Sequence, residues 1–393
     1  MFKFLLCAAL ALPLFASAQQ TPVTPPNTAV QNAPAPTGPA LAAKSWALLD
    51  FNSRQLLASQ NADARVEPAS ITKLMVAYLA FDALKRGKIK RDQSVPVSQT
   101  AFLAGKGGAS KMFLEVGKTA TVDELLHGMI IQSGNDATVL LAELLGGTEA
   151  QFAIQMNQEA AKMGLKNTHF TNAAGMPDPQ HYSTAADIAL LASTLIRDFP
   201  EDYTIYSQKE YTYNKVRQPN RNRLLTLDST VDGMKTGHTN AAGYCLVSSA
   251  LRGPRRLISV VMGSDSDNTR AQESLKLLNY GFQAFDAVQL YAADQEVSKF
   301  KVWKGSQNEV KVGFATPMVV SVPKGMADKV KMELQSKQPL IAPLEKGAAV
   351  GTLSVTLNGQ PLGQYPVLTQ EPVPLAGWFG RLWDALVMWI KGL

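Results

Sequence analysis

The chain has 393 residues, of which 46% are hydrophobic and 18% are charged. This length corresponds to roughly two to three domains, and the hydrophobic share excludes a wholly disordered chain. No uninterrupted apolar run of about 18 residues occurs, so no segment is expected to cross a membrane as a helix. The net charge is +6 without a block of Lys or Arg. Nucleic acid is therefore not expected as a partner, whereas a basic surface facing anionic lipid or cell wall fits this charge.

The first residues have the pattern of a secretory signal. Lys3 is followed by an apolar run over residues 4–15 and then by Ala16-Ser17-Ala18, a small-x-small cleavage site. We therefore expect residues 1–18 to be removed and the protein to be exported. Cys7 lies inside the apolar run and follows Leu6 rather than a small residue, which disfavours lipoprotein processing.

Removal of this segment leaves one cysteine, Cys245, which cannot form an internal disulfide. It lies in a strand-like apolar run, Gly243-Tyr244-Cys245-Leu246-Val247. In such a run a free cysteine usually behaves as a small core hydrophobe. We expect that role rather than a catalytic thiol.

The chain after the signal divides into a linker and an α/β domain. Residues 19–41 contain six prolines and predict an extended linker. Residues 45–58 predict a hairpin, and Glu67-Pro68 predicts the start of a helix that reaches Gly87. Apolar spacing of three and four residues predicts further helices over 122–131, 137–145, 149–163 and 184–197. Strands are expected over 244–250 and 257–263, and then a helix over 270–285, so residues 42–285 form an α/β domain with a helical insert.

The composition changes after this domain. Short alternating runs separated by Gly, Pro and Asn predict a small all-β domain over residues 286–375. Residues 376–393 predict an amphipathic helix, because at 100° per residue its large apolar side chains share one arc and its charged ones face away. From Trp378 such a helix is roughly 24 Å long, shorter than the ~30 Å hydrocarbon core. Three of the five tryptophans lie there, and we expect it to lie in the plane of a membrane surface.

Three short motifs carry the chemistry. They are Ser70-Ile71-Thr72-Lys73, Ser133-Gly134-Asn135 and Lys235-Thr236-Gly237. Each pattern alone is weak, since Ser298-Lys299-Phe300-Lys301 and Ser266-Asp267-Asn268 match the first two. Order and context distinguish the set: the first motif is expected near a helix start, the second in a turn between two helices, and the third at the opening of a strand.

The set indicates acyl transfer. A serine needs a base before it can attack a carbonyl, and Lys73 can serve if burial and a nearby cation such as Lys235 lower its pKa. Ser70 and Lys73 lie three residues apart near a helix start, so their side chains can meet. The Ser70 N–H at that start can donate to the oxygen that becomes negative.

The sequence around these motifs closely resembles that of the low-molecular-mass penicillin-binding proteins, specifically the D-alanyl-D-alanine carboxypeptidases. The resemblance covers the chain from about residue 42 to its end. It is carried by Glu67-Pro68-Ala69-Ser70-Ile71-Thr72-Lys73-Leu74-Met75, Ile130-Ile131-Gln132-Ser133-Gly134-Asn135-Asp136-Ala137, Val231-Asp232-Gly233-Met234-Lys235-Thr236-Gly237-His238-Thr239, Met163-Gly164-Leu165-Lys166-Asn167-Thr168-His169-Phe170 and Tyr182-Ser183-Thr184-Ala185-Ala186-Asp187.

The resemblance implies a fold and an activity. The fold is that of the serine β-lactamases and transpeptidases, an antiparallel sheet with a helical insert, followed by a β-rich domain and a terminal membrane anchor. The activity is removal of the terminal D-Ala from the peptidoglycan pentapeptide through an acyl-serine, with β-lactam antibiotics acylating the same serine. No cofactor or metal is implied. The location implied is the periplasmic face of the inner membrane.

The resemblance also implies site residues. The implied catalytic residues are Ser70, Lys73 and Ser133. The implied substrate-binding residues are Asn135, Lys235, Thr236, Gly237, His238, Arg270 and Arg221. Ser70 is the nucleophile, the N–H groups of Ser70 and His238 form the oxyanion hole, and Thr236 with Arg270 binds the terminal carboxylate. Some members have a His just before the Gly of the loop after the helical insert, where this chain has Ala174-Gly175-Met176.

Two alternatives belong to other classes. A class A β-lactamase would need a Glu that activates the deacylating water, and no Glu-x-x-Leu-Asn lies between Asn135 and Lys235. A non-catalytic, membrane-tethered wall-binding protein would lack the nucleophile or its base, and both Ser70 and Lys73 are present.

Overall fold

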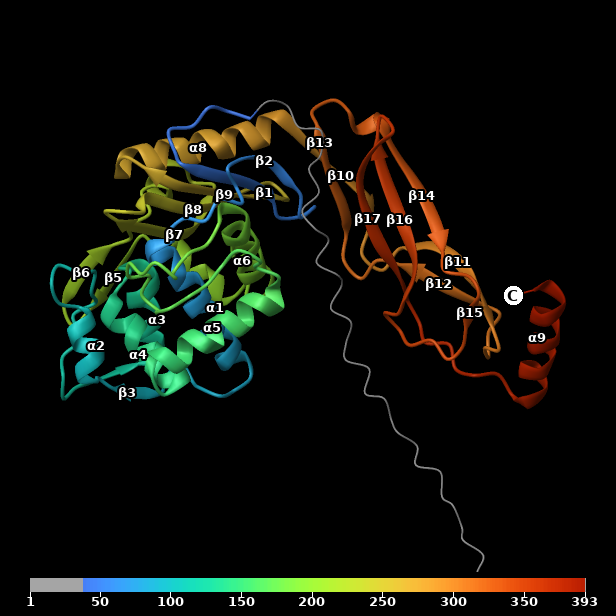
Figure 1. Cartoon of the computed structure of the whole chain (residues 1–393), viewed down its shortest axis with the longest axis horizontal. Coiled ribbons are helices and arrows are strands. Elements are labelled where there is room, and N and C mark those ends of the chain that lie inside the picture. The colour runs from blue at the N-terminus through green and yellow to red at the C-terminus, as the bar shows by residue number, and fades with distance from the viewer. Residues whose placement is uncertain (1–37, 393) are drawn as a thin grey trace, which may run out of the picture.

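The computed structural model describes residues 38–392. The predicted signal peptide and residues 19–37 of the predicted linker lie outside the described residues, as does Leu393. The described chain forms a mixed α/β unit followed by a β-rich unit and a terminal helix (Figure 1). This agrees with the fold class expected from the sequence.

A five-stranded antiparallel sheet forms the centre of the first unit, with strand order β2-β1-β9-β8-β7. Its strands are β1 (Ser45–Asp50), β2 (Leu56–Gln60), β7 (Val231–Thr239), β8 (Gly243–Arg252) and β9 (Arg255–Ser264). The register pairs Trp46 with Val261 and Lys235 with Val247. Strands β1 and β9, which are far apart in the sequence, are therefore neighbours in the sheet.

Helices cover both faces of this sheet. Along β1, Trp46 and Leu48 join the core under helix α8 (Asp267–Ala284), whereas Ala47 and Leu49 join the core of the helical insert. Successive side chains of a strand point to opposite faces. The uninterrupted apolar run of β1 therefore reflects burial on both sides, which Figure 1 shows as α8 above the sheet and most helices of the insert below it.

Capping side chains define where several helices of the helical insert begin. Its helices and 3₁₀ turns are η1 (Ala69–Thr72), α1 (Lys73–Lys85), α2 (Gln99–Ala104), α3 (Val122–Ile131), α4 (Asn135–Gly146), α5 (Glu149–Met163), α6 (Ala185–Asp198), η2 (Asp202–Ser207) and α7 (Leu224–Leu227). Two small hairpins pair β3 (Ser94–Pro96) with β4 (Thr119–Thr121) and β5 (Glu210–Tyr213) with β6 (Val216–Pro219). Thr121 and Glu124 form a capping box at α3, and the Thr184 side chain caps α6.

Two details of this unit differ from expectation. The helix expected from Glu67-Pro68 begins only at Lys73, because Ala69 has a positive φ of 47° and residues 69–72 form a tighter turn. The Lys235-Thr236-Gly237 motif does not open a strand but lies inside β7, since pairing with β8 begins at Val231.

The second unit is built from strands around its own core. β10 (Phe285–Tyr291) pairs with β13 (Met318–Pro323). A six-stranded sheet has the order β14-β16-β17-β12-β11-β15. Its strands are β11 (Glu296–Trp303), β12 (Glu309–Gly313), β14 (Val330–Ser336), β15 (Leu340–Ile341), β16 (Ala349–Leu357) and β17 (Gln360–Thr369), with a 3₁₀ turn, η3 (Ala327–Lys329), before β14.

A buried polar cluster joins the two units. Ser321 Oγ donates to Asp50 Oδ2 (2.9 Å), and Ser321 N donates to Gln55 Oε1 (2.5 Å). Arg255 forms an ion pair with Asp50 (2.8 Å) and donates to Phe285 O (2.6 Å). These hydrogen bonds and this ion pair hold the β-rich unit at the edge of the five-stranded sheet that carries β1 and β2.

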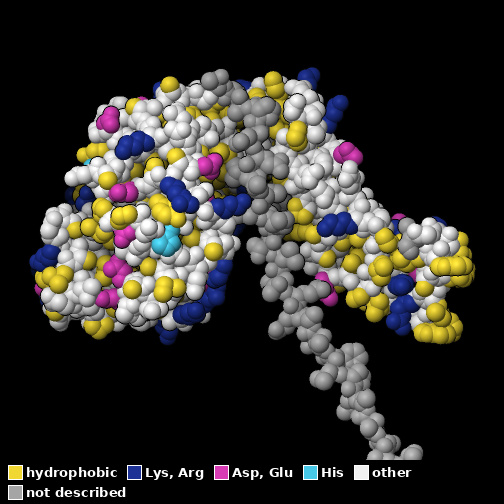
Figure 2. Space-filling model, viewed as in Figure 1, with side chains coloured by type: hydrophobic (Ala, Val, Ile, Leu, Met, Phe, Trp, Pro, Cys, Tyr) yellow, Lys and Arg dark blue, Asp and Glu magenta, His cyan; other side chains and the backbone are white. Residues whose placement is uncertain are grey.

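The terminal helix α9 (Trp378–Lys391) lies at the far end of the β-rich unit (Figure 1). Asp384 Oδ2 accepts from Lys304 N (2.5 Å), and Met388 is buried. Figure 2 shows hydrophobic side chains gathered on this end of the molecule. Among the described residues, no helix has both the length and the apolar character needed to cross a membrane.

Candidate active site

Ser70 lies on the tight turn that precedes α1. Thr72 Oγ1 donates to Ala69 O (2.8 Å), which closes the turn and leaves Ser70 half-buried at its surface. Lys73, the first residue of α1, is 1% exposed. Its Nζ lies 2.7 Å from Ser70 Oγ. The two side chains therefore meet as the three-residue spacing predicts.

The surroundings of Lys73 favour its neutral form. Nζ also donates to Asn135 Oδ1 (2.9 Å) and to Ala174 O (2.9 Å). Its pKa is lowered to about 7, chiefly because burial disfavours the ammonium form and also because Arg221 is positive; Asp136 and Glu149 oppose this shift. A large share of Lys73 is therefore neutral near pH 7 and able to take a proton from Ser70.

The second motif lies in the turn between α3 and α4. Ser133 is 3% exposed and has a positive φ of 62°, which turns the chain so that Asn135 can start α4 facing Lys73. Asn135 N donates to Ser110 O (2.7 Å). The carboxylate of Asp136 accepts from Met112 N (2.9 Å) and Leu114 N (3.1 Å). These hydrogen bonds connect the turn to the loop over residues 105–118.

Strand β7 brings the third motif against the turn that carries Ser70. A side chain at Gly237 would come within 2.9 Å of Pro68 O and 3.2 Å of the Ala69 Cβ, so only glycine permits this approach. Lys235 is 2% exposed and donates to Thr236 O (3.1 Å). Its pKa is lowered well below the usual value by burial and by the positive charges of Lys73, Arg221 and Arg270.

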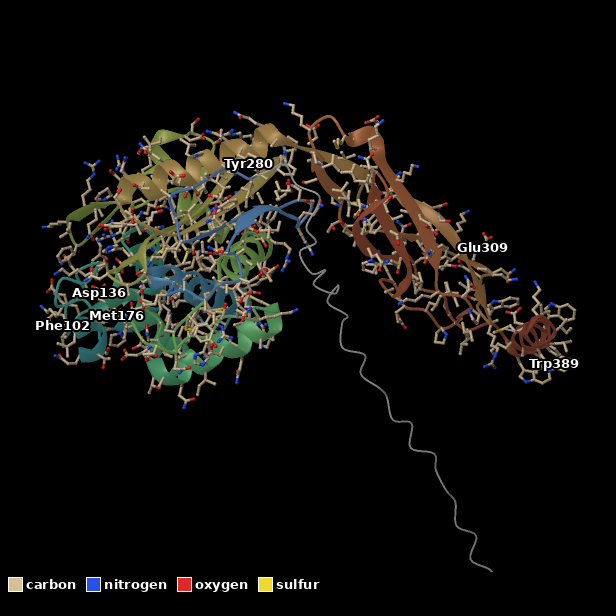
Figure 3. All side chains as sticks on the ribbon, turned by 45° about the horizontal axis from the view of Figure 1, so that its top comes forward. Phe102, Asp136, Met176, Tyr280, Glu309 and Trp389 are labelled. Carbon is tan, nitrogen blue, oxygen red and sulfur yellow. The ribbon has the colours of Figure 1, made fainter. Side chains whose placement is uncertain are left out.

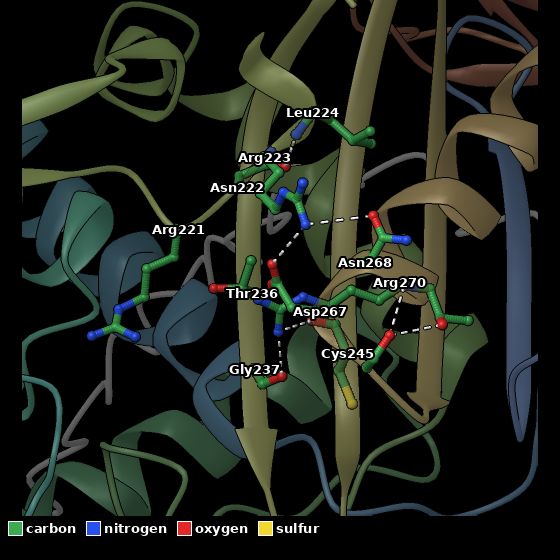
Figure 4. Close-up of polar contacts among 12 residues, drawn as sticks. Arg221, Asn222, Arg223, Leu224, Thr236, Gly237, Cys245, Asp267, Asn268 and Arg270 are labelled. Atoms are coloured by element: carbon green, nitrogen blue, oxygen red, sulfur yellow. Dashed lines mark hydrogen bonds and ion pairs between the residues drawn. The ribbon is translucent and has the colours of Figure 1, made fainter. Parts of the chain in front are cut away.

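Three arginines surround the end of β7 (Figure 4). Arg270 is 7% exposed, donates to Gly237 O (3.1 Å) and Cys245 O (3.4 Å), and pairs with Asp267. Arg223 also reaches Asp267 (3.5 Å). Arg221 lies apart from this cluster, and its Nε donates to Gln132 O (2.9 Å), next to Ser133.

The structure therefore brings several of the predicted residues into contact. Ser70, Lys73 and Asn135 are joined by hydrogen bonds. Gly237 packs on the turn that carries Ser70, and Arg270 contacts Gly237. His238 is exposed and lies against the Tyr244 ring (4.1 Å between ring centroids).

Known protein families match two parts of the chain. Residues 30–266 match the family model described as D-alanyl-D-alanine carboxypeptidase. Residues 285–375 match that of the penicillin-binding protein 5 C-terminal domain. The D-alanyl-D-alanine carboxypeptidase DacC of Escherichia coli (strain K12) is 44% identical over 355 residues, covering 89% of each chain. The chain belongs to the D-alanyl-D-alanine carboxypeptidase family. It is a D-Ala-D-Ala carboxypeptidase of the penicillin-binding type, and hence a hydrolase.

Relatives with known structures share the fold. Penicillin-binding protein 5 from Haemophilus influenzae is 41% identical with a TM-score of 0.80, covering 86% of this chain and 99% of that one. Penicillin-binding protein D2 from Listeria monocytogenes, solved in a cefotaxime-bound form, is 31% identical with a TM-score of 0.58, covering 63% of this chain and 100% of that one.

One part of this carboxypeptidase site was not predicted from the sequence. The loop over residues 171–183 packs closely against the turn over residues 69–72 that carries Ser70. A side chain at Gly175 would lie 1.9 Å from Ala69 O. The Ala174 carbonyl reaches Lys73 from this loop. A backbone carbonyl has no signature in a sequence, so only the fold reveals it.

His181 anchors the same loop. Its Nδ1 accepts from Thr171 N (3.0 Å), so the proton lies on Nε2, which donates to Thr72 Oγ1 (2.8 Å). Burial lowers the pKa of His181 to about 4, so the ring is neutral at physiological pH. His181 contacts the first motif although the two lie about a hundred residues apart in the sequence.

The remaining candidates have structural roles. Cys245 is buried and free, and burial raises the pKa of its thiol to about 11, as suits a core residue. Ser266 caps helix α8. Ser298 and Lys301 lie three apart on strand β11 and so face opposite sides. Within residues 38–392 no cluster of three or more His, Cys, Asp or Glu is arranged to hold a metal.

Proposed function

We propose that this carboxypeptidase uses a serine mechanism with Ser70 as the nucleophile and Lys73 as its base. The observation that carries the proposal is the 2.7 Å contact between Ser70 Oγ and Lys73 Nζ, made by a lysine whose pKa is lowered to about 7. A serine hydroxyl needs a base to attack an amide. A base whose pKa lies near the working pH is the most effective one.

In the first step, Ser70 Oγ attacks the carbonyl carbon of the bond between the two D-Ala residues of the peptidoglycan stem peptide. Its proton moves to Lys73 Nζ, and the carbonyl oxygen becomes negative. The N–H groups of Ser70 and His238 donate to that oxygen. Ser133 and Lys235 then pass that proton from Lys73 to the leaving amine, the C–N bond breaks and D-Ala departs, which leaves Lys73 neutral again. Water hydrolyses the remaining ester and restores Ser70.

Substrate binding uses the groups around this centre. Asn135 Oδ1 accepts a hydrogen bond from Lys73 Nζ, and this leaves the NH₂ of Asn135 for the substrate carbonyl. Gly237 allows the peptide to approach the strand closely. Thr236 and Arg270 bind the terminal carboxylate, and Arg221 adds positive potential. The contacts of Arg270 with Gly237 O and Asp267 hold its charge next to Thr236.

The same centre explains the reaction with β-lactams. A β-lactam presents a reactive amide next to a carboxylate, as D-Ala-D-Ala does, and so meets the same nucleophile. Ring opening leaves no departing amine, and the acyl-serine persists until water attacks it. The chain lacks the Glu-x-x-Leu-Asn segment of class A β-lactamases. We therefore expect β-lactam antibiotics to act as inhibitors rather than as efficient substrates.

We also propose that the enzyme is exported and held at the periplasmic face of the inner membrane by α9. The helix exposes a band of large apolar side chains to solvent. These are Trp378, Phe379, Leu382, Trp383, Leu386, Trp389 and Ile390. A monomer rarely leaves such a band uncovered, and aromatic rings favour the membrane interface. An in-plane helix can bury this band among lipids while the catalytic unit stays in water.

Turnover of a small substrate tests the activity. The whole chain is incubated with a diacetylated L-Lys-D-Ala-D-Ala peptide, and released D-Ala is measured against shortened peptide. Equal amounts of both are expected. Ser70→Ala should lower kcat by about 10³-fold or more, whereas Ser298→Ala, which alters the other Ser-x-x-Lys match, should retain activity. Retention of activity by Ser70→Ala would contradict the assignment.

A further inference from the structure

Met176 projects a thioether into the active site from the loop over residues 171–183. The Asn172 side chain fixes its backbone on both sides, since Oδ1 accepts from Met176 N (2.9 Å) and Nδ2 donates to Met176 O (3.1 Å). The Met176 side chain is nonetheless 51% exposed. Its Sδ accepts from Asn135 Nδ2 at 3.7 Å. Figure 3 shows Met176 near Asp136, the neighbour of Asn135.

The amide that contacts this sulfur is the one proposed to hold the substrate. Asn135 Oδ1 is occupied by Lys73, so only Nδ2 faces the open site. Sulfur of a thioether is a weak hydrogen-bond acceptor. A substrate carbonyl, which is a stronger acceptor, can therefore displace it from Asn135 at little cost.

Oxidation of the sulfur would make Met176, rather than the substrate carbonyl, the stronger hydrogen-bond acceptor for Asn135. In the reaction with a hydroperoxide, the O–O bond breaks, one oxygen bonds to sulfur, and the other leaves as water or alcohol. The sulfur loses two electrons and the peroxide gains them. The product, methionine sulfoxide, is polar and carries an oxygen that accepts hydrogen bonds well. At Met176 this oxygen would lie within reach of Asn135 Nδ2.

We propose that Met176 is a site of reversible oxidation by peroxides, and that its sulfoxide blocks the active site by occupying the amide of Asn135. The inference rests on the proposed role of Asn135 in holding the substrate. Neither Ser70 nor Lys73 is altered by the modification. The block is therefore competitive with substrate and is lifted when methionine is restored.

The rest of the described chain offers few competing sulfur targets. Three of its methionines are more than a third exposed, namely Met176, Met326 and Met332. The other two lie in the β-rich unit, in or next to β14 and its preceding turn. Cys245 is buried, and its raised pKa keeps it a thiol, which peroxide oxidises slowly. Met332→Leu is therefore a matched control for Met176→Leu.

The experiment compares penicillin acylation of the whole chain before and after hydrogen peroxide, with oxidised methionines located by peptide mass spectrometry. In the native sequence and in Met332→Leu, oxidation should lower the acylation rate constant at subsaturating penicillin by roughly tenfold. In Met176→Leu the treated and untreated rates should agree. Methionine sulfoxide reductases with dithiothreitol should restore the rate of the native sequence, a measurement that needs no variant.

Several results would overturn the inference. These are equal losses in Met176→Leu and the native sequence, an undiminished rate when Met176 is oxidised, or a Met176 that stays reduced while Met332 is oxidised. If untreated enzyme were not acylated at Ser70, the proposed mechanism would fall and this inference with it. Normal acylation that is insensitive to Met176 oxidation would remove the inference alone.

Discussion

At the scale of single residues, the proposed mechanism makes the reactivity of the site depend on the protonation of Lys73. Its pKa is lowered to about 7 because burial disfavours the charged form and Arg221 is positive, and the charges of Asp136 and Glu149 offset this only in part. The neutral amine is the form that accepts the Ser70 proton. Activity should therefore be low on the acid side of this pKa and should rise as pH increases through it.

The first prediction follows directly. The rate constant for acylation should rise with pH and level off above neutrality, with a value roughly tenfold lower at pH 6 than at pH 8. Stopped-flow measurement with a chromogenic cephalosporin would give this profile. Lys73→Arg should show no such rise, because a guanidinium stays protonated over the whole range. A flat profile for the native sequence between pH 6 and pH 8 would contradict the role of Lys73.

Most side chains of the candidate site could be identified from the sequence, but some of their hydrogen-bond partners could not. Ser70, Lys73 and Asn135 could be predicted because short motifs specify them, and hydrogen bonds connect them in the structure. The Ala174 carbonyl and His181 could not. Their contacts depend on how one loop folds back over the nucleophile turn, and no local pattern describes that.

At the scale of elements, the loop over residues 171–183 supports the nucleophile turn. It contributes the Ala174 carbonyl, the close packing of Gly175 on Ala69 and the hydrogen bond from His181 to Thr72. Gly175 has a φ of +77°, which residues with a side chain rarely adopt. The loop and the turn therefore have to fit together with no space between them.

A second prediction tests that fit with Gly175→Ala. The added Cβ would meet Ala69 O, so we expect the loop to shift, the Ala174 carbonyl to leave Lys73, and acylation to slow by about tenfold or more. The free energy of unfolding should also fall by more than about 1 kcal/mol. Gly87→Ala is the matched control, because Gly87 also has a positive φ (67°) but has nothing within 4 Å of an added Cβ.

The control should lose stability while its acylation rate stays near that of the native sequence. If Gly175→Ala and Gly87→Ala were acylated at the same rate, the loop would have no part in holding the nucleophile turn. Stability is measured by denaturant unfolding and acylation by fluorescent penicillin, so the two effects are separable.

The helices of the insert could be predicted closely because their apolar spacing and caps agree; those expected over 122–131 and 149–163 have these bounds in the structure. Strand ends were harder to predict. Phe285 was expected to end a helix but starts β10, because its backbone pairs with Pro323. Strand β17 lacks a regular alternation, since Gly363 and Pro366 interrupt it, and its pairing with β16 reveals it only in the structure.

At the scale of the whole molecule, the β-rich unit places α9 at the end remote from the active site (Figure 3, where Trp389 and Met176 mark the two ends). The cluster of Asp50, Gln55 and Ser321 fixes this unit to the catalytic sheet. Such contacts join residues more than 260 positions apart and could not be predicted from the sequence. With α9 on a membrane, as proposed, the β-rich unit would act as a spacer between lipid and peptidoglycan.

A third prediction concerns attachment. Deleting residues 376–393 should release the enzyme from vesicles containing anionic lipid while leaving turnover of small peptides unchanged, because the core of the β-rich unit does not include α9. A second variant, Phe379→Asp with Trp389→Asp, keeps the helix but adds charge to its apolar band and should also reduce binding. Sedimentation with vesicles measures both.

The attachment proposal would be contradicted if the truncated protein still sedimented with vesicles, or if it unfolded. Unfolding would mean that α9 completes the β-rich unit through Asp384 and Met388 instead of contacting lipid.

The most direct test of the central claim, that Ser70 is the acylated nucleophile, is the intact mass of the protein after treatment with benzylpenicillin. The account predicts a single adduct with the mass of one penicillin, located on the peptide that contains Ser70 and absent from Ser70→Ala. The Ser133→Ala variant should still fold, and the same adduct should appear more slowly in it. An adduct that persists in Ser70→Ala, or one located on another residue of the native sequence, would contradict the account.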